Sequence, residues 1–490
     1  MKYPHLLRLI VLCLIGFTLI MGARAVTPAS PDPLEALVAP DSPLRAGDVL
    51  AFHGDYITEV ADSPGGYADI LKQAIYARRP DWGIRFVTAG DTGFRSVSLS
   101  PENLQTQLLT QQPTVVFIFI GNHDIGVSAT SSTAVTPLPV YTQALQQEIT
   151  LIRAAGAVPI LATPAVIGEK ADGSNPRDAL LEIYAASSRK VAAAQGVECC
   201  DLRAAFLDYL RRHNPENRDR GILTVDGVYL SPAGNRLVAA CAAKSIVSAL
   251  RAVPWYIPLQ DRLLLAGQPV TLCGRGADNR GLDIRYTLDG SQPTAHSPRY
   301  RRPIPISNPT RLTIRVQEIA TGHLFTSSAL LTPTTLRKPD NPPQVTQGLH
   351  YQRYDYDATA SRQLPDFAQL TPIEHGTLPT PFFFPKPGHE VLGLQMRAYL
   401  DVPRDGIYTF FSRAYFGNRL FIGDTLVVDH PFTTAKITCR GQIALHAGKH
   451  AIRLEYCRLK NGDSSEWFYY QGPGIPMQMI PETILYRPAD

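Results

Sequence analysis

Polar side chains follow several strand-like segments of the N-terminal half, where they could act together on one ligand. Tyr56 comes directly after the run VLAFHGD, His123 follows IFIGN, and Gly90 ends the run FVTAG. Asp226 and Tyr229 lie further along, in the segment TVDGVYL. A phenol, an imidazole and a carboxylate can bind a polar ligand, and a tyrosine activated by a histidine can also act as a nucleophile.

Short apolar runs alternate with helix-like stretches over residues 45–252, and these elements must position the polar side chains. The strand-like runs are Asp48–Phe52, Ile84–Thr88, Thr114–Ile120 and Ala157–Ala162. The helix-like stretches are Tyr67–Arg79, Tyr141–Ala155, Ala179–Gln195 and Ser231–Leu250. This alternation predicts a parallel sheet covered by helices on both faces, a three-layer α/β domain. Ligands of such sheets bind at the carboxyl ends of the strands, where the polar side chains lie.

The texture of the sequence changes after residue 252. Helical periodicity disappears and prolines multiply, so residues 254–336 are predicted to form a small all-β sandwich. The stretch RKPDNPP opens a stiff linker over residues 337–347. Residues 348–490 are again rich in strand and turn signals and predict a second, larger β-sandwich.

The α/β part resembles the SGNH (GDSL-like) hydrolase family, which has a flavodoxin-like fold. The resemblance is carried by four blocks in the family's order: Val49–Thr58 (VLAFHGDYIT), Thr88–Gly90 (TAG), Ile118–Asp124 (IFIGNHD) and Thr224–Asn235 (TVDGVYLSPAGN). In the family these blocks carry Gly-Asp-Ser, a glycine, Gly-x-Asn-Asp and Asp-x-x-His. The resemblance implies an acyl hydrolase in which serine attacks, histidine takes its proton and aspartate orients the histidine.

The functional positions of that family are only partly kept. The serine position holds Tyr56, the asparagine position His123 and the histidine position Tyr229. The oxyanion glycine, Gly90, and the acid, Asp226, are retained. A phenol titrates near 10 and is a poor general base at neutral pH, and a tyrosine ring would fill the space of an acyl group. We therefore expect the ordinary hydrolase mechanism to be lost.

Three functions stay open for this part of the chain. The polar cluster could bind a ligand without converting it. It could hydrolyse ester bonds of carbohydrate substrates by rewired chemistry, with His123 or His53 deprotonating Tyr56. Alternatively, the tyrosines could fill a closed pocket, with Asp226 accepting a hydrogen bond from a phenol.

Both β-rich parts resemble accessory domains of carbohydrate-active enzymes. The middle part resembles the C-terminal β-sandwich of chitobiase and β-hexosaminidases through Tyr286–Thr294 (YTLDGSQPT). The last part resembles the protective-antigen-type (PA-fourteen) domain through Asp405–Phe410, Arg419–Asp424, Leu445–Glu455 and Gly472–Pro481. The resemblances imply a glycan or cell-surface polysaccharide as partner.

The last domain lacks the calcium ligands of some sugar-binding relatives. Those relatives carry paired aspartates before a Gly-x-Arg-Leu turn, where this chain has Tyr415 and Phe416. Calcium needs carboxylate oxygens, so no metal is expected, and no other cofactor is implied. Tyr415, Phe416 and Trp467 could form an aromatic sugar platform or belong to the core.

The start of the chain reads as an export signal. A basic beginning, an apolar stretch over Leu9–Met21 and the small residues at Ala23–Ala25 predict a signal peptide over residues 1–25, cleaved after Ala25. No later run is apolar and long enough to span a membrane. We therefore expect a secreted, periplasmic or cell-surface protein. The chain has 47 basic and 43 acidic residues. This near balance of charge does not indicate a nucleic acid partner, so none is expected.

Export permits disulfides among the six cysteines that follow the signal. Cys439 and Cys457 lie in neighbouring strand-like segments and could pair with each other. The alternative is that they are buried thiols.

Overall fold

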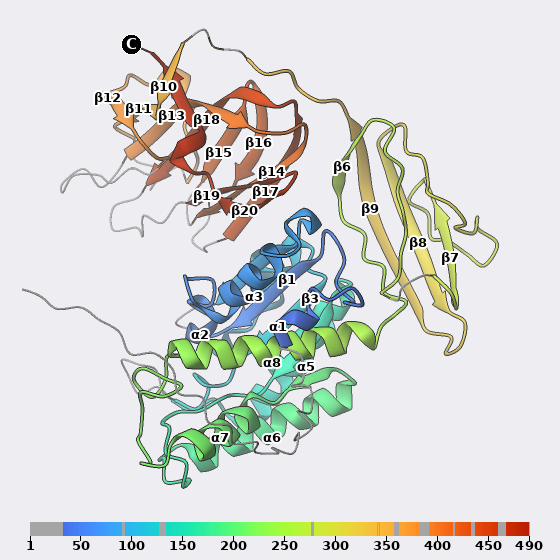
Figure 1. The fold of residues 1–490 in the computed structure, drawn as a ribbon, viewed down its shortest axis with the longest axis vertical. Helices are drawn as coiled ribbons and strands as arrows, with labels where there is room; N and C mark the ends of the chain where they lie inside the picture. The colour runs from blue at the N-terminus through green and yellow to red at the C-terminus, as the bar shows by residue number, and fades with distance from the viewer. Residues whose placement is uncertain are drawn as a thin grey trace, which may run out of the picture.

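The computed structural model describes residues 33–90, 94–126, 134–275, 279–340, 342, 344–356, 362–381, 392–414, 417–432, 437–458 and 467–489. Within these ranges the chain forms an α/β part followed by two all-β parts, which confirms the predicted fold class. In Figure 1 the α/β part is blue to green, the middle part yellow and the last part orange to red. None of the described helices combines the length and apolar composition needed to cross a bilayer.

The α/β part is built on a five-stranded parallel sheet in the order β2-β1-β3-β4-β5. Its strands are β1 (Val49–Gly54), β2 (Arg85–Gly90), β3 (Val115–Phe119), β4 (Val158–Ala162) and β5 (Glu198–Cys200). This order matches that of flavodoxin-like folds, in which a ligand crevice opens beside the first strand.

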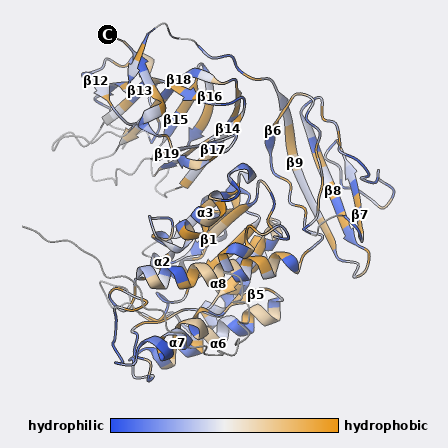
Figure 2. Ribbon diagram, viewed as in Figure 1, coloured by the Kyte–Doolittle hydropathy of each residue, from blue (hydrophilic) through white to orange (hydrophobic). Residues whose placement is uncertain are grey.

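Helices cover both faces of this sheet. They are α1 (Pro33–Ala36), α2 (Tyr56–Glu59), α3 (Tyr67–Tyr76), α4 (Pro101–Gln107), α5 (Leu138–Ala154), α6 (Asp178–Gln195), α7 (Leu202–His213) and α8 (Pro232–Arg251). Alternate residues of β1 point to opposite cores: Phe52 packs with residues of α3 and α8, and Ala51 with residues of α4, α5 and α6. Burial on both faces explains why the strands read as continuous apolar runs, and Figure 2 shows β1 as a hydrophobic centre.

The middle part is a four-stranded sheet in the order β6-β9-β8-β7. Its strands are β6 (Arg262–Leu265), β7 (Leu282–Thr287), β8 (Thr310–Glu318) and β9 (Leu324–Thr334). The apolar face of the sheet is covered by segments joined through the bridge between Val270 and Ile304.

The last part packs two sheets against one core. The larger contains β10 (Val345–Gln347), β11 (Leu349–Tyr354), β12 (Glu374–Leu378), β13 (Leu392–Val402), β15 (Asn418–Ile422), β16 (Thr425–His430), β18 (Gly448–Arg458) and β21 (Leu485–Pro488). The smaller has the order β17-β14-β19-β20, from β14 (Gly406–Ala414), β17 (Ile437–Leu445), β19 (Trp467–Gly472) and β20 (Ile475–Met479). Residues of the expected linker lie on this part: the Arg337 amide donates to the Ala444 carbonyl, and β10 pairs with β21.

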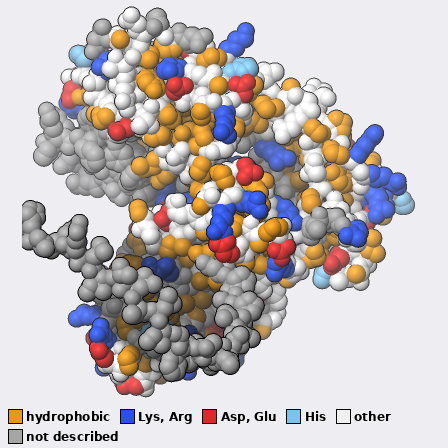
Figure 3. All heavy atoms as spheres, in the orientation of Figure 1, with side chains coloured by type: hydrophobic (Ala, Val, Ile, Leu, Met, Phe, Trp, Pro, Cys, Tyr) orange, Lys and Arg blue, Asp and Glu red, His pale blue; other side chains and the backbone are white. Residues whose placement is uncertain are grey.

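The three parts contact one another. Arg275 of the middle part pairs with Asp48, which directly precedes β1. Arg413 of the last part pairs with Asp62 of the α/β part at 2.7 Å. The Leu263 amide of the middle part donates to Gln442 Oε1 of the last part at 2.9 Å. On the face shown in Figure 3, acidic and basic side chains are interspersed in small groups.

The suggested pairing of Cys439 with Cys457 is wrong. Cys439 is a free thiol on β17, in the smaller sheet, whereas Cys457 is buried on β18, in the larger sheet. Neighbouring strand-like segments of the sequence have entered opposite layers of the sandwich. The thiols of Cys199, Cys200, Cys241 and Cys273 are also free.

Candidate active site

The candidate site lies at the carboxyl end of β1, where α2 begins. Asp55 caps this helix, since its Oδ1 accepts from the Ile57 amide at 3.1 Å. Tyr56 therefore occupies the first helical position. Gly54 has no room for a side chain, because an added Cβ would lie 2.1 Å from the Phe119 carbonyl oxygen.

The structure brings the three aromatic residues of the candidate site together. The ring of Tyr56 meets that of His123 at a centroid distance of 5.7 Å and that of Tyr229 at 5.2 Å, both edge to face. Tyr56 is only 1% exposed. Such edge-to-face pairs are favourable packing contacts, so the three rings form a compact aromatic cluster.

The Tyr56 phenol is buried in surroundings that keep it protonated. No described residue meets its oxygen in hydrogen-bonding geometry. Burial first, and then the negative charges of Asp55 and Asp226, raise the pKa of Tyr56 well above that of a free phenol, while the Asn122 amide acts in the opposite direction. A phenol of this kind is a poor nucleophile at neutral pH.

His123 is engaged in local hydrogen bonds. Its backbone amide donates to Asp55 Oδ2 at 3.2 Å, and its Nδ1 lies 3.1 Å from the Phe94 carbonyl oxygen. A carbonyl oxygen only accepts, so Nδ1 carries the proton in this contact. Nδ1 of His123 is therefore not the atom that could deprotonate Tyr56.

His53, the other candidate base for Tyr56, points elsewhere. Its Nδ1 lies 2.5 Å from Glu148 Oε1 on α5, and both side chains are buried. The ring also meets that of Phe94 at 4.9 Å. His53 alternates with Phe52 along β1 and so faces the opposite helical layer from Tyr56, which excludes it from the suggested role.

The filled-pocket hypothesis suggested that Asp226 accepts a hydrogen bond from a phenol. In the structure its carboxylate instead supports a turn. Its Oδ1 accepts from the backbone amides of Val228 at 2.9 Å and Tyr229 at 2.8 Å. The residue is exposed. The phenol of Tyr229 is half-buried, and burial followed by the charges of Glu59 and Asp226 raises its pKa.

Gly90 closes β2 against the start of the site. An added Cβ would lie 2.1 Å from the backbone nitrogen of Glu59, so only glycine allows β2 to approach α2 this closely. Asn122 lies in the loop after β3 and holds the chain beyond β4. Its Oδ1 accepts from the Ala165 amide at 2.9 Å and its Nδ2 donates to the Val166 carbonyl at 3.2 Å.

Two buried carboxyl groups beneath the cluster were not expected as site residues. Burial, reinforced by the negative charge of Asp124, raises the pKa of Asp55 to about 7 against the amides that donate to it. Asp124 accepts from the Ser96 hydroxyl at 2.5 Å, and burial raises its pKa too. Both aspartates lie in sequence blocks that resemble the SGNH family. Their raised pKa values, however, follow from burial, which only the structure shows.

A third buried carboxylate, Glu169, was missed because no motif marks it. It is fully buried and accepts from the amides of Ile222 at 2.8 Å and Leu223 at 2.6 Å and from the Thr224 hydroxyl at 2.7 Å. These contacts fix the turn that leads to Asp226. No sequence signal identifies its partners, which lie more than fifty residues away.

The aromatic platform suggested for the last domain stays a prediction. Tyr415 and Phe416 lie outside the described residues. Trp467 opens β19, where its backbone lies opposite Arg413 of β14. Among the described residues no group of three or more histidine, cysteine, aspartate or glutamate side chains is arranged to hold a metal ion.

Comparison with protein families assigns all three parts. Residues 52–237 match the GDSL-like Lipase/Acylhydrolase family. The α/β part is a GDSL-like domain. Residues 264–329 match the chitobiase/β-hexosaminidase C-terminal domain, and residues 384–486 match the PA14 domain.

The GDSL-like domain is also similar to solved structures. The acetyl xylan esterase AlAXEase is 31% identical, with 41% of this chain and 100% of that chain covered and a TM-score of 0.38. A variant of Axe2, an acetyl xylan esterase from Geobacillus stearothermophilus, is 23% identical, with 42% and 96% covered and a TM-score of 0.36. LAE5, an α/β hydrolase from the metagenome of Lake Arreo in Spain, is 22% identical, with 41% and 99% covered and a TM-score of 0.35. No curated protein matches the chain.

Proposed function

We propose that this protein is exported and binds a glycan or cell-surface polysaccharide without hydrolysing it. One observation supports the proposal that the protein does not hydrolyse its ligand. Tyr56 stands where the GDSL-like family has its serine, is only 1% exposed and packs edge-on against His123 and Tyr229. Its ring fills the space of an acyl group, and its buried phenol stays protonated.

The described hydrogen bonds of the neighbouring groups do not reach the Tyr56 phenol. A general base must lie within hydrogen-bonding reach of the proton that it removes. Nδ1 of His123 serves the Phe94 carbonyl, and His53 pairs with Glu148. Asp226 is occupied by backbone amides of its own turn.

The two domains that follow the GDSL-like domain support a carbohydrate ligand. The chitobiase/β-hexosaminidase C-terminal domain and the PA14 domain follow it in the chain, an argument by association rather than from a site. The PA14 domain also offers a suitable surface. A groove of about 810 Å³ lies on its larger sheet, lined by residues of β11, β12, β13 and β18.

The groove is formed by side chains that face outward from adjacent strands. His350 of β11 lies opposite Arg397 of β13, which lies opposite Arg453 of β18. Tyr399 stands two residues from Arg397 on the same face of β13. Planar aromatic rings beside hydrogen-bond donors suit a sugar, whose ring presents apolar faces and hydroxyl edges.

Hydrolysis is tested with an activated acetate ester and with acetylated polysaccharides. The protein is compared with its Tyr56→Phe and Asp226→Ala variants. We expect only the background rate in all three. Turnover that disappears in both variants would contradict the proposal and make Tyr56 a nucleophile.

Binding is tested by calorimetry against a panel of soluble polysaccharides. We expect Arg397→Ala to weaken binding at least about tenfold, because it removes a charged donor from the groove. Arg404→Ala, at an exposed turn of the same domain, serves as the matched control and should leave affinity unchanged. Affinity that falls in Asp226→Ala and not in Arg397→Ala would move the site to the GDSL-like domain. The absence of binding to every glycan would overturn the proposal.

Export is part of the same proposal and has a separate test. Residues 1–25 lie outside the described residues, and their basic start, apolar stretch and small residues support a cleaved secretory signal. We expect N-terminal sequencing of the protein from its producing cells to begin at Val26. An N-terminus at Met1 would contradict cleavage.

A further inference from the structure

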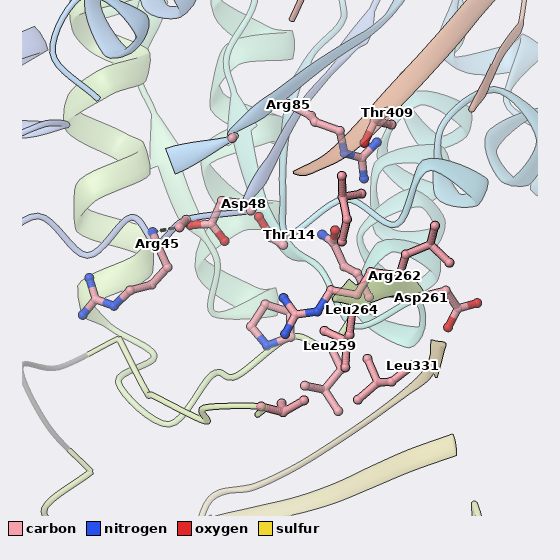
Figure 4. A pocket seen from close by; sticks show the side chains of 18 of the residues that line it. Arg45, Asp48, Arg85, Thr114, Leu259, Asp261, Arg262, Leu264, Leu331 and Thr409 are labelled. Carbon is pink, nitrogen blue, oxygen red and sulfur yellow. Dashed lines mark hydrogen bonds between the residues drawn. The ribbon is translucent and has the colours of Figure 1, made fainter. Parts of the chain in front are cut away.

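A cavity of about 620 Å³ lies where the three domains meet. Figure 4 shows its polar side chains approaching from all three. Asp48, Arg85 and Thr114 come from the GDSL-like domain, Arg262 from β6, and Thr409 from β14 of the PA14 domain. Gln442 and Gln471 flank Thr409 on the neighbouring strands β17 and β19, so one polar row of the smaller sheet faces the cavity.

The cavity has more positive than negative charge. Its lining contains the arginines Arg45, Arg85, Arg262, Arg275 and Arg440, and the aspartates Asp48 and Asp261. The aspartates are already engaged. Asp48 binds both terminal nitrogens of Arg275, at 2.5 and 2.7 Å, and Asp261 Oδ1 accepts from the Leu330 amide at 2.7 Å. Among the described residues, neither Arg85 nor Arg440 has a carboxylate in ion-pair contact.

Three buried residues that line the cavity each have a donor without a described acceptor: Arg85, Arg275 (at its Nε) and Gln471. Arg85 is 4% exposed, and its Nη2 donates to the Gln111 carbonyl at 2.9 Å while its Nη1 has no described partner. Gln471 is 8% exposed, and its Nε2 also has no described partner. A buried donor without an acceptor destabilises the folded state by about 1–3 kcal/mol. A ligand that supplies acceptor oxygens would remove this cost.

The two guanidinium groups without a described carboxylate partner also influence each other, and Arg440 Nη2 donates to Gln112 Oε1 at 2.9 Å. Burial first, and then the positive charge of Arg440, hold the pKa of Arg85 well below its ordinary value. Burial likewise lowers the pKa of Arg440, against the opposing effect of Asp261. Both arginines remain charged at neutral pH, because a guanidinium does not lose its proton in proteins. An anion between them would relieve this repulsion.

We propose that this cavity binds an oxyanion, with Arg85, Arg440 and Gln471 as its donors. A carboxylate or sulfate group presents several acceptor oxygens, and guanidinium groups bind such groups with paired hydrogen bonds. The group could belong to an acidic saccharide or be a free inorganic ion. Because the donors come from two domains and the lining from three, the bound anion would hold the domains together.

The test measures binding of sodium glucuronate and sodium sulfate to the full protein by calorimetry at constant ionic strength. Glucose and additional sodium chloride serve as neutral and simple-ion controls. We expect both oxyanions to bind and to raise the unfolding temperature, since a ligand of the folded state stabilises it. Tighter binding of glucuronate would identify the saccharide source, and tighter binding of sulfate the inorganic one. The proposal fails if neither binds or if chloride has the same effect.

Two variants locate the site. Gln471→Glu places a carboxylate where the anion would lie, so it should weaken binding at least about tenfold and raise the unfolding temperature without ligand. Arg85→Gln should weaken binding similarly. Gln478→Glu, at an exposed position of the adjacent strand β20, is the matched control and should change neither. Unchanged binding in Gln471→Glu overturns the proposal even if Arg85→Gln does not fold. Arg397→Ala, in the glycan groove, should leave anion binding intact, which separates the two proposals.

Discussion

The aromatic cluster of the GDSL-like domain and the cavity at the domain junction are both buried and polar, but they are completed differently. Around Tyr56, rings fill the space, and the nearby side chains of Asp226, His123 and Asn122 bind backbone atoms. At the junction, Arg85 and Gln471 line a cavity, and Arg85 Nη1 and Gln471 Nε2 have no described acceptor.

The place of a site in the fold and its present capacity to bind a ligand are therefore two separate properties. The cluster occupies the place where the resemblance to the SGNH family puts the catalytic residues, yet its rings pack against one another, and its only unpaired buried group in the described structure is the neutral Tyr56 phenol. The junction occupies no such place, yet it has unpaired charge and unpaired donors. Unsatisfied groups in a buried site are better evidence for a ligand than the position of the site in the fold.

The largest effect should come from breaking the ion pair at the junction. Arg275→Ala leaves Asp48 buried without its partner, and both side chains are nearly inaccessible. We expect a loss of about 3–5 kcal/mol in the free energy of unfolding, measured in urea. Arg285→Ala breaks a more exposed pair with Asp283 in the same domain and should cost less than about 1 kcal/mol. Equal losses would show that burial of the junction pair has no special weight.

The next effect is a pH dependence that arises beneath the aromatic cluster. Burial raises the pKa of Asp55 to about 7, so the folded protein keeps this proton at pH values where the unfolded chain has lost it. Stability from this group is therefore full below about pH 4 and declines as the pH rises toward 7, by roughly 4 kcal/mol at most. Asp55→Asn cannot ionise, so its stability relative to the native protein should increase over this range, as measured by urea unfolding at each pH.

Asp201 provides a control of opposite sign. Despite partial burial, its hydrogen bonds and the charge of Arg189 hold its pKa below the ordinary value. Its contribution is present at neutral pH and is lost as the pH falls. Asp201→Asn should therefore lose stability relative to the native protein as the pH rises through the acidic range. The same pH trend in both variants would contradict the assignment to Asp55.

A smaller effect is expected from the carboxylate that fixes the turn before Asp226. Glu169→Gln keeps the size of the side chain but removes a charged acceptor from buried donors. We expect a loss of about 2–3 kcal/mol in the free energy of unfolding. Hydrogen exchange should become faster at the amides of Ile222 and Leu223. Glu102→Gln, at an exposed position of α4, should change neither quantity.

The smallest effect should come from the phenol at the centre of the cluster. Tyr56→Phe removes an oxygen without a described partner, so the free energy of unfolding should change by less than about 1 kcal/mol. Tyr141→Phe is the matched control, since its equally buried phenol bonds the Ser188 hydroxyl at 2.8 Å. It should lose about 1–2 kcal/mol, as measured by urea unfolding. A larger loss in Tyr56→Phe would show that its phenol binds a partner.

Much of the fold was predictable because local patterns report burial. The strands β1, β2, β3 and β4 lie within a few residues of the apolar runs that predicted them. β5 was missed, since its three residues Glu198–Cys200 have no apolar pattern and are recruited by pairing with β4. The pairing suggested for Cys439 and Cys457 failed for a related reason, because sequence proximity does not say which sheet a strand will join.

The sequence by itself determined which residue types stand at the ends of the strands, including Tyr56 at the position where the resemblance to the SGNH family expects a serine. Only the tertiary structure decided that His53 belongs to Glu148, that Asp226 serves its own turn, and that Arg85 and Gln471 face one cavity. The physical reason is that burial, charge pairing and hydrogen bonding depend on neighbours from distant parts of the chain, and no local pattern contains them.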